Sequence, residues 1–206
     1  MSLNIDNLDN LHMDVLREIG NIGAGNAVTA LSKMLNKKID MDVPKVKVMK
    51  FKDVNEILGG AEIPVVGLLL NVTGDINGSI MFILRSNAAR TLVNILMGRS
   101  IKDESEFKEI ELSALQEIGN ILASSYLASL STLTNLSIMP SVPELAIDMA
   151  GAILSVPAIQ FGAVSDSVLY IETEFSEGSR KVVGDFFLVP DVDSYGVLLK
   201  ALGVIG

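Results

Sequence analysis

Cysteine and tryptophan are both absent from this chain of 206 residues, and histidine occurs once. The absence of cysteine excludes disulfides, thiolate metal sites and a cysteine nucleophile. The single histidine, His12, excludes a multi-histidine metal site, and its place in the segment L-H-M-D favours an exposed residue at the start of a helix. We therefore expect neither a metal site nor a cofactor of the protein's own.

Clustered positive charge is also missing. The chain carries 16 Lys and Arg against 25 Asp and Glu, a formal net charge of −9, and it has no run of basic residues. Binding to a nucleic-acid backbone requires clustered Lys and Arg. The composition therefore disfavours a nucleic-acid partner.

No apolar run is long enough to cross a membrane. The longest apolar region, residues 146–164, is interrupted by Asp148, Pro157 and Gln160, whereas a membrane helix needs about 20 mainly apolar residues. The first residues lack a basic segment followed by an apolar one, which is the pattern of a secretory signal. We expect a cytoplasmic protein without a membrane span, whose 49% hydrophobic residues suffice for a sizeable core.

What the sequence does contain is a long repeat. The segment L-R-E-I-G-N-I at residues 16–22 returns as L-Q-E-I-G-N-I at residues 115–121, so Glu18 and Asn21 recur as Glu117 and Asn120, 99 positions later. A period of this length indicates a duplicated domain, because solenoid repeats are usually about 20 to 50 residues long.

The match extends on both sides of these segments. Asp14 and Ser113 precede the two glutamates by four positions, and Pro44 and Pro143 follow the two asparagines after 22 intervening residues. Both copies therefore share the pattern [DS]-x3-E-x2-N-x22-P.

Helical spacing places the acid and the amide on one face. At about 100° per residue, Asp14, Glu18 and Asn21 lie within about 60° of one another. Apolar or small residues are predicted to form the buried face, and these are Leu16, Ile19, Gly23, Ala27, Ala30 and Met34 in the first copy and Leu115, Ile118, Leu122, Tyr126 and Leu133 in the second. Each copy thus predicts a helix with an outward acid and amide.

A polar face alone does not establish a function, because every surface helix needs one. Some inward positions differ between the copies, with Gly23 becoming Leu122 and Ala27 becoming Tyr126, whereas the outward Glu and Asn are unchanged. A solvated face has no physical need for that identity. On the residues alone, a functional and a purely structural interpretation both stay open.

The glycines of G-N-I-G-A-G-N, residues 20–26, do not have the spacing of a phosphate-binding loop and follow no predicted strand. Glycine inside a helix costs about 1 kcal/mol relative to alanine, so these residues predict the close approach of another backbone. In the second copy, Ser113-x-x-Gln116 fits a capping box. Ser113 is therefore either a helix cap or a site residue.

The remaining pattern predicts strands joined as hairpins between helices. Helices are expected at residues 9–36, 53–58, 86–96, about 107–134, 148–161 and 194–202, and strands at 43–51, 63–72, 78–84, around Pro143, 168–175 and 182–189. Hairpins exclude βαβ crossovers throughout, so we expect an α+β fold: a duplicated pseudo-twofold domain with two long motif helices packed on a largely antiparallel sheet. The halves are residues 1–98 and 109–206 of one compact domain, joined by a charged connector at 99–108.

The doubled pattern resembles the CheC/CheX/FliY family of chemotaxis phosphatases over nearly the whole chain. Two copies favour the CheC branch of this family, since CheX has one motif and FliY carries an additional C-terminal switch domain, of which there is no trace before the last residue, Gly206. Asp14 and Ser113 are the two permitted variants at their position.

The resemblance implies hydrolysis of the phosphoaspartate of a CheY-type response regulator, at Glu18 with Asn21 and at Glu117 with Asn120. In this family the Asn orients the attacking water and the Glu engages the regulator, which is expected to hold the Mg²⁺. The resemblance also implies a second partner, the receptor deamidase CheD, on the helix at about 148–161, with Asp148 and Leu154 as its predicted contacts.

Two alternatives remain open from the sequence. In the first, the protein is a non-enzymatic adaptor whose apolar helix at 148–161 restrains CheD, although such an apolar helix is also typical of a buried core. In the second, it is a structural component of the flagellar switch, against which the absence of an appended switch domain counts.

Overall fold

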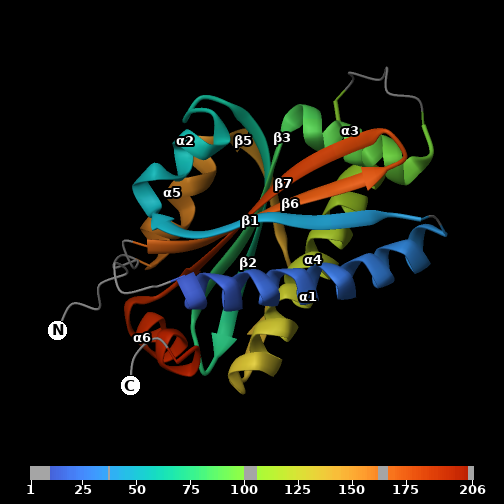
Figure 1. The fold of residues 1–206 in the computed structure, drawn as a ribbon. Helices are drawn as coiled ribbons and strands as arrows, with labels where there is room; N and C mark the ends of the chain where they lie inside the picture. The colour runs from blue at the N-terminus through green and yellow to red at the C-terminus, as the bar shows by residue number, and fades with distance from the viewer. Residues whose placement is uncertain (1–9, 37, 100–105, 162–166, 204–206) are drawn as a thin grey trace.

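One antiparallel sheet organises the chain in the computed structural model, which describes residues 10–36, 38–99, 106–161 and 167–203 (Figure 1). Its strands are β1 (Asp40–Lys50), β2 (Pro64–Gly74), β3 (Gly78–Arg85), β4 (Ile138–Pro140), β5 (Glu144–Met149), β6 (Ser167–Glu177) and β7 (Arg180–Pro190). They lie in the order β1-β6-β7-β3-β2-β4, and β5 also pairs with β2. All six pairings are antiparallel.

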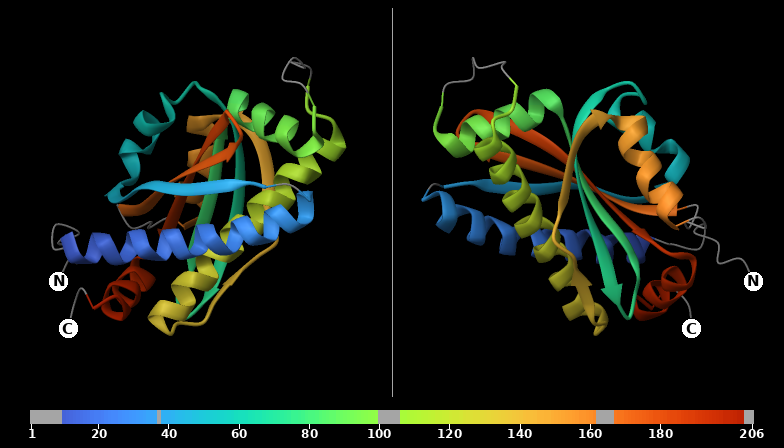
Figure 2. Two further views of the ribbon diagram at one scale, coloured as in Figure 1. Left: turned by 45° about the vertical axis from the view of Figure 1, so that its right-hand side comes forward. Right: turned by 180° about the vertical axis from the view of Figure 1, so that it is seen from behind.

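Helices cover both faces of this sheet, as Figure 2 shows. They are α1 (Asn10–Leu35), α2 (Val54–Leu58), α3 (Ser86–Met97), α4 (Glu109–Thr134), α5 (Ala150–Phe161) and α6 (Val192–Ala201), with a 3₁₀ turn at Phe51–Asp53 before α2. The larger core lies under α1, α3, α4 and α6, and the smaller core lies under α2 and α5. The predicted α+β fold with a largely antiparallel sheet is confirmed.

The two halves exchange their edge strands. β1 belongs to the first half but pairs with β6 of the second, and β5 belongs to the second half but pairs with β2 of the first. β3 and β7 pair with each other at the centre. The strand order therefore reads the same from either edge, as a pseudo-twofold axis between β3 and β7 requires. The division into residues 1–98 and 109–206 stays a prediction about the repeat, and strand pairs cross it.

The two motif helices cross at a glycine. A Cβ atom built on Gly23 of α1 would lie 2.5 Å from Cδ1 and 3.0 Å from Cα of Tyr126 on α4. Tyr126 is 3% exposed, and its hydroxyl lies 2.8 Å from the Thr173 hydroxyl of β6. The predicted close helix contact is confirmed at Gly23, whereas Gly25 is exposed with no atom within 4 Å of its Cβ position.

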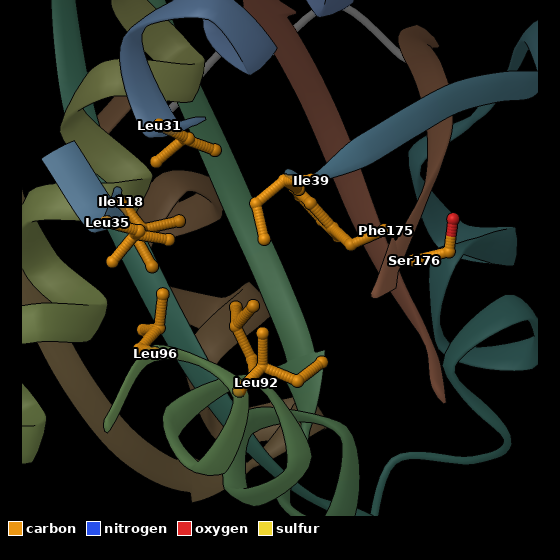
Figure 3. Close-up of a pocket in the computed structure, with 9 residues that line it drawn as sticks. Leu31, Leu35, Ile39, Leu92, Leu96, Ile118, Phe175 and Ser176 are labelled. Atoms are coloured by element: carbon orange, nitrogen blue, oxygen red, sulfur yellow. The ribbon is translucent and has the colours of Figure 1, made fainter. Parts of the chain in front are cut away.

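Beyond the crossing, the buried line on α1 runs through Ala24, Ala27 and Leu31. Ala30 and Met34 were predicted to be buried but are exposed, and so is Leu133 near the end of α4. The reason is that the second part of α1 packs toward α3 and β6. There Leu31 and Leu35 meet Leu92, Leu96 and Phe175 around a cavity of about 10 Å³ (Figure 3), which has room for at most one water molecule.

The crossing generates a matched prediction on stability. We expect Gly23→Ala to lower the free energy of unfolding by about 1–3 kcal/mol, because the added methyl group overlaps Tyr126. Gly25→Ala should instead raise it by about 0.5–1 kcal/mol, because it removes a glycine from an open helical position. Urea unfolding of both variants measures the two effects. Equal effects of the two substitutions would contradict the assigned crossing.

Candidate functional site

Local packing turns the Glu and Asn of each motif outward. In E-I-G-N of α1, Ile19 is 3% exposed and a Cβ on Gly20 would lie 3.1 Å from Cγ1 of Val43 in β1. In E-I-G-N of α4, Ile118 is 1% exposed and a Cβ on Gly119 would lie 2.6 Å from Cδ2 of Leu68 in β2. The Ile and the Gly therefore face the sheet, and the flanking Glu and Asn lie on the remaining side of the helix.

The four predicted site residues lie at the surface. Glu18, Asn21 and Glu117 are exposed, and Asn120 is half-buried. Within the described part of the chain, none of their side chains makes a hydrogen bond or an ion pair. The fold therefore leaves two amides, each one turn from a carboxylate, available to another molecule.

Asp14 lies on the same exposed face of α1. Its Oδ1 atom accepts a hydrogen bond of 2.9 Å from Nη1 of Arg17, and both side chains are largely exposed. Such a surface ion pair contributes at most about 1 kcal/mol to stability. This ion pair orients the Arg17 side chain toward Asp14. Within the described chain, the side chains of Glu18 and Asn21 have no hydrogen-bond or ion-pair partner.

Ser113 does not cap α4, so the predicted capping box at Ser113 and Gln116 is wrong. The helix begins at Glu109, and the Ser113 hydroxyl donates to the Glu109 carbonyl, 3.0 Å away, inside the first turns. The cap is instead formed by Glu111, whose Oε2 accepts from the Lys108 N–H at 2.9 Å. Sequence spacing alone does not distinguish these two starts.

Glu111 also ties the connector to α3. Its carboxylate is 1% exposed and accepts from Arg90 at 3.0 Å and from Arg99 at 2.7 Å. The Lys108 N–H and the two guanidinium groups hold the pKa of Glu111 below its usual range, against the effect of its burial. This buried carboxylate caps the N-terminus of α4, the helix that carries Glu117 and Asn120.

The two motif prolines mark the same irregularity in equivalent edge strands. Pro143 is buried between β4 and β5, and its carbonyl accepts a hydrogen bond of 2.5 Å from Nε2 of Gln116, next to Glu117. Pro44 lies in β1 where the pairing with β6 shifts register between Asp42 and Lys45. Proline has no N–H to donate to a ladder, so both prolines suit positions where strand pairing is interrupted.

The two predicted CheD contacts differ in accessibility. Asp148 is exposed and lies in β5, because α5 begins only at Ala150. Leu154 is 4% exposed within the smaller core, so its assignment as a contact residue is corrected: it holds α5 onto the sheet. The exposed apolar side chains of this region are Ile147 and Met149 of β5 and Val156 and Ile159 of α5.

Sequence reasoning missed these four apolar residues. Val156 and Ile159 are three positions apart on α5, on a different side from Ala150, Leu154 and Pro157, which are buried. A helical projection of α5 separates the two groups, but it does not say which group faces the sheet, because both are apolar. Only the packing decides that.

Comparison with known proteins follows the same two segments. A model of the CheC-like family matches residues 11–48 and 110–147, which contain the two motifs from Asp14 to Pro44 and from Ser113 to Pro143. The CheY-P phosphatase CheC of Bacillus subtilis is 40% identical over 195 residues, which is 93% of this chain and 93% of that protein. The chain belongs to the CheC-like family.

Solved structures agree with membership of this family. FliY of Thermotoga maritima superposes with a TM-score of 0.72 at 29% identity, over 95% of this chain and 98% of that one. CheX of Borrelia burgdorferi, in a complex with CheY, BeF₃ and Mg²⁺, superposes with a TM-score of 0.50 at 18% identity over 84% of this chain and 96% of that one, which shows the fold alone.

The predicted family and the hydrolase class are thereby confirmed. The B. subtilis relative is named a CheY-P phosphatase, and phosphatases are hydrolases. No helix in the described residues is both long enough and apolar enough to span a membrane. Similarity to these proteins does not decide the roles of the individual site residues.

Proposed function

We propose that this protein hydrolyses the phosphoaspartate of a CheY-type response regulator at two equivalent sites, one on α1 and one on α4. The observation that carries the proposal is the exposure of Glu18 with Asn21 and of Glu117 with Asn120, without partners in the described chain, inside the two segments matched by the family. The relative named CheY-P phosphatase CheC supports the choice of substrate.

The chemistry needs little from this protein beyond positioning. An acyl phosphate is already activated, so hydrolysis requires a water molecule in line with the phosphorus–oxygen bond that breaks. A carboxamide carries both a donor and an acceptor, so Asn21 or Asn120 can hold that water, as an amide does in GTP hydrolysis. The helical backbone keeps the amide in a fixed orientation relative to the docked regulator.

The acid next to each amide has a different role. Glu18 and Glu117 each precede the Asn by three positions, on the same face. We assign them to the regulator, where each carboxylate pairs with a basic side chain at the phosphorylation site. The regulator supplies the Mg²⁺, consistent with the CheX complex, which contains CheY, BeF₃ and Mg²⁺.

The first test is the double variant Asn21→Ala with Asn120→Ala. We expect it to return regulator-phosphate decay to the rate of the regulator alone, a loss of about 10²–10⁴-fold if the water-positioning role is complete. The measurement is a time course of phosphate loss with Mg²⁺ in both reactions. Asn26→Ala, at an exposed position on α1 outside the motif, is the control. Full activity of the double variant with an unchanged urea midpoint would refute the proposal.

A second test separates binding from water positioning. Glu18→Ala and Glu117→Ala should each weaken binding to the phosphorylated regulator, because each removes one side of an ion pair. Titration of the regulator against each variant measures this affinity, with the exposed acid Glu109→Ala as control. Unchanged affinity in both variants would remove the glutamates from the binding role.

We further propose that the surface formed by β5 and α5 binds CheD. Val156 and Ile159 of α5 are 44% and 79% exposed, and Val156 lines a cavity of about 130 Å³ together with Ile153. Asp148 of β5 pairs with Val65 of the smaller core, so its side chain points to the same face of the sheet as α5. Exposed apolar clusters of this kind mark interaction surfaces. The surface does not include the motif faces of α1 and α4, so both activities fit on one chain.

A third test concerns this surface. Asp148→Lys and Ile159→Glu should each weaken CheD binding at least about tenfold while phosphatase activity is retained, because neither residue lies on α1 or α4. Asp193→Lys on α6 is a control charge reversal at an exposed position. Pull-down and calorimetry with purified CheD measure the effect. Unaltered binding in both variants would place the CheD contact elsewhere.

A further inference from the structure

A polar cavity lies on the sheet face that α2 and α5 cover only in part. Its volume is about 320 Å³, and its walls include Ile57 of α2, Arg85 at the end of β3, Asn87 of α3, Tyr170 and Glu172 of β6, and Asp185 of β7. Tyr170 belongs to the smaller core, on the opposite face of the sheet from α1 and α4. The cavity is therefore separate from the two motif sites.

The acceptors in this cavity outnumber the donors that serve them. The Tyr170 hydroxyl lies 2.8 Å from Oδ1 of Asp185 and 2.9 Å from Oε2 of Glu172, but it carries one hydrogen and can donate to only one of them at a time. Asp185 is 7% exposed, and within the described chain Tyr170 is its one hydrogen-bond partner. Burial raises the pKa of Asp185 to about 6.

The positive charges near Asp185 are engaged by groups other than its carboxylate. Arg85 donates through Nη2 to the Ile57 carbonyl at 3.2 Å. Lys45 is 3.9 Å from Glu172, and Lys47 lies over the Tyr170 ring with Nζ 5.5 Å from its centroid. Neither lysine makes a hydrogen bond to Asp185. A buried carboxylate thus faces a cavity without a charged donor of its own.

The first half of the protein contains positions equivalent to those that line this cavity, so the two sets of residues can be compared. Gly78 of β3 corresponds to Gly184 of β7, so Ser79 stands where Asp185 does. Ser79 pairs with Asn71 as Asp185 pairs with Glu172, and Leu69 precedes Asn71 by two positions as Tyr170 precedes Glu172. The same place in the fold is therefore filled by Leu, Asn and Ser in one half and by Tyr, Glu and Asp in the other.

Packing does not require the charged set, because the uncharged set builds the equivalent strands. A buried carboxylate that lacks a full complement of donors costs stability. Residues that break a packing rule without a structural gain are found at functional sites. This asymmetry points to a ligand that supplies the missing donors.

We propose that this cavity binds a small zwitterion of the amino-acid class. Its ammonium or guanidinium group donates to Asp185 and Glu172, and its carboxylate faces Arg85 and Asn87 at the start of α3. An organic cation fits better than a bare metal ion, because the described residues bring only two carboxylates together here and an arginine lines the same cavity.

The test uses the full chain and defined probes. L-Arginine and L-lysine are titrated calorimetrically at pH 7.5, next to putrescine, which lacks the carboxylate, and glutarate, which lacks the ammonium. We expect the amino acids to bind, putrescine to bind more weakly, and glutarate not to bind. Failure of both amino acids to bind, or binding of glutarate equal to theirs, would overturn the proposal.

Variants then assign the site. Asp185→Asn keeps the shape of the side chain and an oxygen acceptor for Tyr170, and it should weaken amino-acid binding about 10- to 100-fold. Glu172→Gln is a second variant with the same expectation. Arg85→Gln should weaken amino-acid binding but leave putrescine binding unchanged. Asp193→Asn, an exposed acid on α6, is the matched control. Wild-type affinity in both Asp185→Asn and Glu172→Gln would refute the assignment.

Discussion

The antiparallel pair β3–β7 is the contact on which the two halves of this protein depend. Phe82 and Phe186 are directly opposite each other in this pair, with their rings stacked 4.4 Å apart. A Cβ on Gly78 would lie 2.3 Å from the Val189 carbonyl oxygen, and one on Gly184 would lie 2.3 Å from the Phe82 ring. Glycine at these equivalent positions lets the central strands and rings approach, and their pairing makes one sheet from two repeats.

The positions of the motif helices follow from this sheet. The edge strand of each half pairs with a strand of the other half. As a result α1 packs on β1 and β6, and α4 packs on β2. The helices then cross at Gly23 and Tyr126, and one glycine suffices for a single crossing. Packing at this crossing thus explains why inward residues differ between the two copies. Packing does not explain why the outward Glu and Asn are the same in both copies, and the proposed phosphatase sites account for that identity.

Because the two halves share one fold, they can carry different side chains at equivalent surface positions. The edge strand β1 carries Asp40, Asp42, Lys45 and Lys47, and such charges protect an edge from pairing with other chains. The equivalent strand β5 exposes Ile147 and Met149 instead, which suits a partner. The polar cavity at Tyr170 and Asp185 is a further difference of this kind, on the same shared skeleton.

The sequence by itself determined the features that arise from neighbouring residues. It determined the long motif helices, the hairpins and the outward direction of the Glu and Asn pairs, and it placed glycine at the turn between β2 and β3 and after α3, where φ is positive. These features depend on helical period and on backbone conformations that favour glycine. The family resemblance rested on the same local motifs and was correct.

Only the tertiary structure decided the features that join distant segments. The start of α4 depends on Arg90 and Arg99 reaching Glu111, and the burial of Leu154 depends on which side of an apolar helix meets the sheet. The pairing of Tyr170 with Asp185 depends on the register of two neighbouring strands. Periodicity shows which residues share a face, but not what lies opposite that face, because the opposite surface comes from another part of the chain.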